Sequence, residues 1–215
     1  MTSHTYWDKE VVEYINKTIP HHSDILDVGA GAAKYWHLLG NEYKMDAIEV
    51  FEPYIELYNL RNAYKVVYNV NVLDFTADKR YALSIMGDCL EHLTVQDAQK
   101  VIDILSNYCD ECLFVIPYEY PQHEMNDNVH EIHLQPDLTP FNVKLRFPNL
   151  HPLFIKYNGK DWYLSEEGIG IGIYSTRKIQ QKDVVTRFEN PVIERLFLDF
   201  YFNLDNYQSS RTFIN

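Results

Sequence analysis

The sequence predicts an α/β fold in which helices cover both faces of a mostly parallel sheet. The first observation is that apolar, strand-like runs alternate with segments of helical spacing through most of the chain. The second is the run Ile25–Gly31 (ILDVGAG), where an apolar strand ends in an acidic residue and two glycines before a helix-compatible segment. The third is Glu49, which follows Gly31 by 18 residues and ends the next apolar run.

The predicted elements follow one another in a regular order. Helical spacing of Trp7, Val11 and Ile15 predicts an N-terminal helix within residues 1–20. The segment 21–175 is expected to form the core of the domain. Its strands are predicted over 24–29, 44–50, 65–71, 81–87 and 111–117, and its helices over 32–39, 53–62, 94–107 and 136–146.

The pattern changes in the last third of the chain. Two further strands are predicted over 153–157 and 169–174. The glycine alternation of 168–172 superficially suggests a phosphate loop, but a period of two without a following helix favours a strand. A final helix is predicted over 190–205, where Pro191 suits the first turn, and the tail 206–215 is expected to fray.

Length and composition limit the protein class. The chain has 215 residues, enough for one domain, which is expected to span 1–205. A net charge of −12 makes a nucleic-acid partner unexpected. Three cysteines are too few for a disulfide framework, and the C-x-x-C of Cys109 and Cys112 lacks a second pair for zinc. With no leader and no apolar run near ~18 residues, we expect a cytoplasmic protein without a membrane partner.

The glycine turn and the following acid have a direct chemical interpretation. Glycine allows a ligand to approach the backbone closely at Gly29 and Gly31, and the N-terminal end of the next helix adds amide donors. Glu49 ends the second strand at a spacing that suits a carboxylate accepting hydrogen bonds from ribose hydroxyls. The sequence therefore predicts a nucleotide-type pocket at this edge of the sheet.

Four matches at proper spacings carry a family resemblance. Asp27, Gly29 and Gly31 form D-x-G-x-G, with Ala33 where a third glycine is common, and Glu49 is the acid that ends the second strand. The remaining two matches are the segments 73–75 (LDF) and 87–93 (GDCLEHL). With these motifs the chain resembles the class I S-adenosylmethionine-dependent methyltransferases over roughly residues 20–175.

The resemblance implies a Rossmann-like, doubly wound sheet of seven strands, mostly parallel with an antiparallel C-terminal strand. It also implies S-adenosylmethionine as the cofactor, with its methionine part near the glycine turn and Asp88, its ribose on Glu49 and its adenine facing Asp74. The residues expected to bind it are Asp27, Gly29, Ala30, Gly31, Glu49, Val50, Asp74, Phe75 and Asp88. A nicotinamide-dependent dehydrogenase shares the glycine-and-acid pattern, but it does not predict the segment 88–92.

The segment 116–133 is the expected acceptor side, because it follows the fifth strand at the edge where α/β sheets bind ligands. Its Gln122, Asn128, Glu131 and His133 are similar to an order found in a subset of bacterial methyltransferases. In one interpretation His133 or His130 removes a proton from the acceptor while Glu131 orients the imidazole. His92 is also expected to face the acceptor.

Two other interpretations of this segment stay open. A divalent metal could be bound by His123, His130 and His133 with a carboxylate. The spacing of 130–133 is not a standard zinc helix motif, so no metal site is predicted. Alternatively, the segment is a polar loop whose side chains hydrogen-bond its own backbone and fix the wall of the site.

The expected function is methyl transfer to an unidentified acceptor, a small-molecule or sugar-like hydroxyl or amine. Two alternatives belong to other classes. One is a non-catalytic scaffold that keeps the cofactor pocket. The other is a nucleic-acid methyltransferase that would use the basic residues of 177–187 (Arg177, Lys178, Lys182 and Arg187). The aromatic final helix is expected either to cap the sheet or to form a dimer interface, so the protein is expected to be a monomer or a homodimer.

Overall fold

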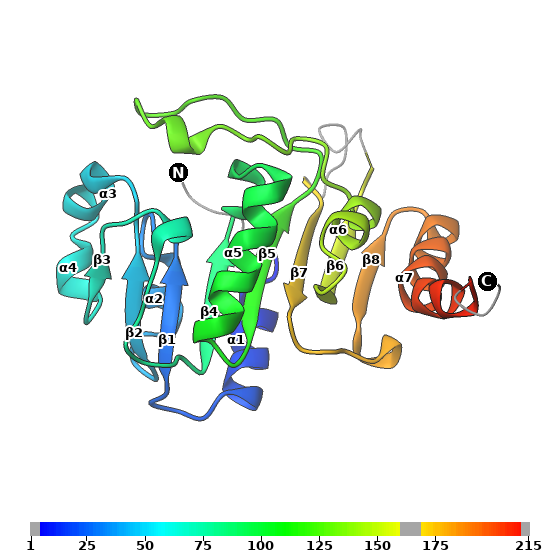
Figure 1. Cartoon of the computed structure of the whole chain (residues 1–215), viewed down its shortest axis with the longest axis horizontal. Helices are drawn as coiled ribbons and strands as arrows, with labels where there is room; N and C mark the ends of the chain where they lie inside the picture. The colour runs from blue at the N-terminus through cyan, green and yellow to red at the C-terminus, as the bar shows by residue number, and fades with distance from the viewer. Residues whose placement is uncertain (1–4, 160–168, 212–215) are drawn as a thin grey trace.

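A computed structural model describes residues 5–159 and 169–211 of the chain. They form one eight-stranded sheet with the strand order β3-β2-β1-β4-β5-β7-β6-β8. Helices lie on both faces of this sheet, and a long loop arches over one end of its strands (Figure 1). The predicted doubly wound α/β fold is therefore confirmed, with one strand more than the sequence analysis counted.

The N-terminal half alternates strands and helices as predicted. Its parallel strands are β1 (Asp24–Val28), β2 (Lys44–Ile48), β3 (Val67–Tyr68), β4 (Leu83–Gly87) and β5 (Cys112–Pro117). Its helices are α1 (Asp8–Thr18), α2 (Lys34–Leu39), α3 (Glu52–Leu57), α4 (Leu60–Ala63) and α5 (Val95–Tyr108). Thr94 caps α5, because its hydroxyl oxygen accepts a hydrogen bond from the backbone N–H of Asp97 at 3.1 Å.

In the N-terminal half, two predicted elements differ from the structure. The helix expected over 53–62 is broken into α3 and α4, because Asn59 adopts the left-handed conformation with φ of 54°. The strand expected over 65–71 is only β3, and the chain then turns into a short 3₁₀ helix, Val72–Asp74. Asn71 starts that turn by accepting a hydrogen bond from the backbone N–H of Leu73.

The C-terminal half adds three strands and two helices. These are α6 (Pro140–Arg146), β6 (His151–Tyr157), β7 (Ile171–Ser175), β8 (Val185–Phe188) and α7 (Pro191–Arg211). β7 lies between β5 and β6 and is antiparallel to both, which confirms the reversed strand. β8 pairs in parallel with β6 and was missed. α7 runs to Arg211, into the predicted tail, and 212–215 lie outside the described residues.

Alternation along the strands divides the core into two apolar layers. On one face, Leu26 and Val28 of β1 pack in a cluster with α5, α6 and α7. On the other, Ile25 packs with apolar residues of α1, α2, α3 and α4. Because β1 is in register with both β2 and β4, Val28 lies opposite Ile48 and Met86, so these three strands end together. Their carboxyl ends create the edge where the candidate site lies.

Candidate functional site

A cavity of about 520 Å³ lies at the carboxyl ends of β1, β2 and β4. Its wall includes the glycine turn after β1, the carboxylate after β2 and the start of the segment after β4. The loop between β5 and α6, which arches over this end of the sheet in Figure 1, adds residues 128–132 and Leu134. The size is typical of a pocket for a small molecule or cofactor.

The turn after β1 needs glycine for steric reasons. Gly29 has a φ of +72° and Gly31 a φ of +46°, both in the left-handed region. A Cβ on Gly29 would lie 2.1 Å from the Sγ of Cys89, so the turn packs directly against the segment after β4. Gly29, Ala30 and Gly31 all line the cavity, as the motif led us to expect.

Ala33 occupies the position where a third glycine is common. Its φ is +59°, so this alanine adopts a left-handed conformation immediately before α2. Such a conformation costs a residue with a Cβ about 1–2 kcal/mol. The side chain is nevertheless buried, and the backbone keeps the turn that a glycine would make.

Glu49 is the buried carboxylate beside the glycine turn. One of its oxygens accepts a hydrogen bond from the backbone N–H of Gly31 and the other from that of Phe51, both at 2.9 Å. The side chain lines the cavity although Glu49 is only 5% exposed. Burial raises the pKa of Glu49, and the two amide donors oppose that rise. Each carboxylate oxygen has a second lone pair and can accept another hydrogen bond from a ligand.

Asp27 anchors the base of the same turn. Its carboxylate is buried and accepts a hydrogen bond from the hydroxyl of Tyr64 at 2.5 Å. Burial raises the pKa of Asp27 to about 7, with the nearby charge of Glu49 acting in the same direction and the hydrogen bond from Tyr64 opposing it. Asp27 therefore carries a proton over part of the acidic range, while its side chain connects the glycine turn to the end of α4.

The adenine-facing residues proposed from the resemblance are not at the cavity. Asp74 is exposed at the end of the 3₁₀ turn, and Phe75 is buried in the core against Tyr68 and Tyr108. The cavity wall in this region is made instead by Asn71 and Val72, at the start of the turn. The turn displaces the wall by a few residues, because a 3₁₀ helix follows β3 where a longer strand was expected.

The segment after β4 brings the predicted Asp88 and His92, and Cys89 next to Asp88, to the cavity. Asp88, Cys89 and His92 all line it. Asp88 has a φ of +50°, so the chain turns sharply as it leaves the strand. His92 is partly buried, and burial lowers the pKa of its imidazole. Val50, the last of the expected residues of the cofactor side, also lines the cavity.

The loop between β5 and α6 is held by its own polar side chains. The amide nitrogen of Gln122 donates to the backbone carbonyl of Glu131 at 2.8 Å and to its carboxylate at 3.1 Å. The side-chain oxygen of Asn128 accepts from the backbone N–H of His130 at 3.0 Å. His130 and Glu131 line the cavity, whereas His133 is buried behind the wall. The Gln-Asn-Glu pattern of the sequence thus fixes the loop's conformation.

Sequence reasoning missed the role of Glu91, which lies behind His92. The residue is buried, and burial raises the pKa of its carboxyl well above the usual value, with the charge of Asp88 adding to the rise. The Oε1 of Glu91 is 3.9 Å from the Nε2 of His92 and 3.8 Å from the Nε2 of His133. The two imidazole rings meet edge to face, with centroids 4.5 Å apart. The sequence had placed Glu91 only within a matching motif.

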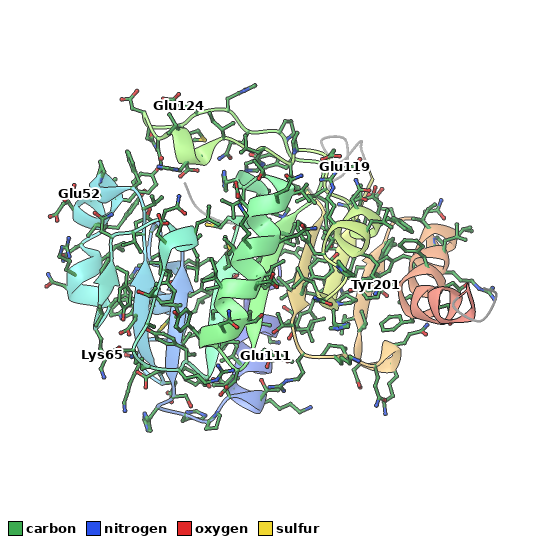
Figure 2. The ribbon with its side chains drawn as sticks, viewed as in Figure 1. Glu52, Lys65, Glu111, Glu119, Glu124 and Tyr201 are labelled. Atoms are coloured by element: carbon green, nitrogen blue, oxygen red, sulfur yellow. The ribbon has the colours of Figure 1, made fainter. Side chains whose placement is uncertain are left out.

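Arg177, the first of the basic residues of 177–187, lies in another part of the molecule. Arg177 forms a 2.6 Å ion pair with the buried carboxylate of Glu111, which also accepts a hydrogen bond from Tyr14. Figure 2 shows Glu111 at the end of the sheet opposite to Glu119 and Glu124 of the arching loop. This end is remote from the cavity, so the arginine serves to neutralise a buried acid there.

Comparison with known proteins identifies the fold of the chain. No family model and no curated protein matches the chain. Solved structures do match, among them a S-adenosylmethionine-dependent methyltransferase from Clostridium acetobutylicum ATCC 824, which is 12% identical with a TM-score of 0.58 over 81% of this chain and 91% of that chain. CalS10, an amino pentose methyltransferase from Micromonospora echinaspora, is 12% identical with a TM-score of 0.56 over 79% of this chain and 90% of that chain.

A third match is the N-methyltransferase NodS from Bradyrhizobium japonicum WM9, at 10% identity and a TM-score of 0.53 over 80% of this chain and 97% of that chain. At these identities the likeness defines the fold. The chain has the fold of the class I S-adenosylmethionine-dependent methyltransferases. In the part of the chain that the structure describes, no helix is long and apolar enough to cross a membrane.

Proposed function

We propose that the protein is a methyltransferase that binds S-adenosylmethionine in the cavity. The observation that carries the proposal is Glu49, a carboxylate buried beside the glycine turn yet accessible from the cavity. It holds the backbone N–H of Gly31 and retains lone pairs for further donors. A carboxylate in this position is suited to accept both hydroxyls of a ribose, as charge-assisted hydrogen bonds.

The cofactor's other parts would be held by the remaining walls. The turn amides near Gly29 would contact the methionine part, with Asp88 on the other side. The adenine would lie against Val50, Asn71 and Val72, in place of the predicted Asp74 and Phe75. Among the described residues of the wall, four side chains are carboxyls and one is a lysine: Asp27, Glu49, Asp88, Glu131 and Lys34. This balance favours a ligand with positive charge, such as a sulfonium.

The acceptor is proposed to be a small molecule with a sugar-like hydroxyl or amine. The loop of 128–134 closes one side of the cavity, and the remaining space of about 520 Å³ suits a small molecule. His92 and His130 line that side, and the imidazole of His130 can accept the proton that the acceptor loses when it receives the methyl group. One matched structure, CalS10, is an amino pentose methyltransferase, which supports an acceptor of this class. Holding the acceptor in line contributes much of the rate.

Calorimetric titration tests the cofactor assignment. The protein is titrated with S-adenosylmethionine, with S-adenosylhomocysteine and with NAD, and we expect binding of the two adenosyl sulfur compounds only. Glu49→Gln should raise their Kd by at least about 10-fold, because one charge-assisted hydrogen bond contributes roughly 1.5–3 kcal/mol. Glu52→Gln, an exposed neighbour at the start of α3, is the matched control. Binding of NAD in place of the sulfur compounds would contradict the proposal.

The redox state of the cysteines supports a proposal about the cellular location. All three cysteines (Cys89, Cys109 and Cys112) are free thiols in the structure, and two of them are buried. Free thiols are usual in proteins of the reducing cytoplasm. We therefore propose a cytoplasmic enzyme, which a cell fractionation with an antibody to the chain would test.

A further inference from the structure

We propose that Glu91, His92 and His133 bind a divalent transition-metal ion beside the cavity. His92 and Glu91 lie in the turn after β4, and His133 lies in the arching loop. One ligand atom from each residue can be chosen so that all lie within 4.8 Å of one another. Two imidazoles and one carboxylate form a donor set that proteins use for zinc, iron and cobalt.

The orientation of both imidazoles is fixed by the backbone. The Nδ1 of His92 faces the carbonyl oxygen of Ile132 at 3.3 Å, and the Nδ1 of His133 faces that of Tyr120 at 2.6 Å. A carbonyl only accepts, so each Nδ1 carries the hydrogen and each Nε2 presents a lone pair. Both Nε2 atoms are turned towards Oε1 of Glu91. A hydrogen bond from one ring nitrogen to a carbonyl commonly orients the other nitrogen of a histidine toward a metal ion.

Glu91 supplies an independent reason for a cation. The residue is only 1% exposed, and neither carboxylate oxygen has a hydrogen-bond partner among the described residues. A buried carboxyl without partners is strongly destabilising, so such a group calls for a bound cation or a ligand. The two histidines approach the same oxygen at 3.8 and 3.9 Å, too far for hydrogen bonds.

These separations suit an ion held between the three side chains. Metal bonds to imidazole nitrogen and carboxylate oxygen are about 2.0–2.2 Å long, so two ligands of one ion lie roughly 3–4 Å apart. The distances from Glu91 to the two imidazoles fall in that range. A proton shared within the cluster would instead draw one pair of atoms to hydrogen-bond distance.

The ion would have one side open to the cavity. His92 belongs both to the cluster and to the cavity wall, and its side chain is 12% exposed, whereas Glu91 and His133 are nearly inaccessible. Three protein ligands leave a position for another oxygen or nitrogen donor. This last step rests on the proposed function: an acceptor hydroxyl on the ion would have a lowered pKa and lose its proton more readily before methylation.

The test measures metal binding directly. The full chain is treated with a chelator, then titrated with Co²⁺, Zn²⁺ and Mg²⁺ by calorimetry, and the Co²⁺ complex is followed by its visible absorption. We expect one site for Co²⁺ and Zn²⁺, with Mg²⁺ weaker because imidazole nitrogen suits the former ions. The same preparation is titrated with S-adenosylmethionine, so failure of the metal site and failure of the cofactor site are seen separately.

Variants locate the ion. Glu91→Gln keeps the shape of the side chain and should weaken Co²⁺ binding by at least about 100-fold, since even the loss of a group that only hydrogen-bonds a metal ligand costs about 10–100-fold in affinity. His133→Ala should do the same and abolish the visible bands. His123→Ala changes an exposed histidine of the same loop and should leave binding unchanged. Absence of a site in the unaltered chain, or an affinity for Co²⁺ in Glu91→Gln and His133→Ala equal to that of the unaltered chain, would overturn the proposal.

Discussion

Replacing Gly29 by alanine should destabilise the protein, because the glycine turn after β1 packs directly against Cys89 in the segment after β4. The alanine Cβ would lie 2.1 Å from Cys89 Sγ but 3.6 Å from Cys89 Cβ, which is ordinary contact. Two terms should add. A left-handed residue with a Cβ costs about 1–2 kcal/mol, and overpacking costs about 1–3 kcal/mol. The free energy of unfolding should therefore fall by roughly 2–5 kcal/mol.

A second substitution separates these two terms. Cys89→Ala removes the sulfur, so in that background Gly29→Ala should show only the backbone term of about 1–2 kcal/mol. The coupling energy of the double-mutant cycle should be about 1–3 kcal/mol, favouring the double variant over the sum of the single ones.

Urea unfolding of the four proteins, followed by circular dichroism, measures this coupling. Cys109→Ala, at a buried cysteine away from the turn, is the control background and should leave the effect of Gly29→Ala unchanged. A coupling below about 0.5 kcal/mol between positions 29 and 89 would refute the reasoning, because additive effects indicate independent sites. It would mean that the Cys89 side chain turns aside freely.

Three further predictions concern the same floor and its covering loop. Ala33→Gly should change the free energy of unfolding, measured by urea unfolding, by less than about 1 kcal/mol. Glycine relieves the cost of the left-handed conformation, but it also loses the buried methyl group and gives the unfolded chain more conformational entropy, and these effects offset one another. Gln122→Ala should accelerate amide hydrogen exchange in the loop around Glu131, since both of its donated hydrogen bonds are lost. The pKa of Asp27 rises on folding from 3.8 to about 7. The folded protein therefore holds the proton of Asp27 more tightly than the unfolded chain does, which adds up to about 4 kcal/mol to the free energy of unfolding. This contribution is fully present below about pH 4 and is lost as the pH rises through about 7. Asp27→Asn should flatten that pH dependence of thermal unfolding, and an unchanged slope would contradict the assignment.

The sequence predicted well what depends on local spacing. The acid at the end of β2 was found because it ends an apolar run 18 residues after Gly31, and the structure places Glu49 against the Gly31 amide at the edge where the parallel strands end. The glycines were found because glycine adopts left-handed conformations at little cost, and Gly29 and Gly31 both have positive φ. Asp74 does not line the cavity, because the 3₁₀ turn after β3 depends on Asn71 capping Leu73, and this capping pattern is too short to distinguish from a strand end.

Features that depend on tertiary contacts could not be predicted in the same way. β8 escaped notice because it is a short, half-exposed strand, with Val185 and Arg187 facing solvent, and among the described strands it pairs with β6 alone. Such a strand has no apolar run to identify it. The break at Asn59 was also invisible, since asparagine is tolerated both in a helix and in the left-handed conformation that ends one.

The cluster around Glu91 shows why distance along the chain hides a site. The backbone carbonyl of Glu91 accepts hydrogen bonds from the N–H groups of Leu134 at 2.9 Å and Gln135 at 3.0 Å. The buried side chain of Gln135 adds hydrogen bonds to two carbonyls of the same turn. These bonds fasten the arching loop to the turn after β4, and so place His133 beside Glu91. The loop therefore acts with the turn as one unit, because the contacts that close the cavity wall also assemble the three proposed ligands.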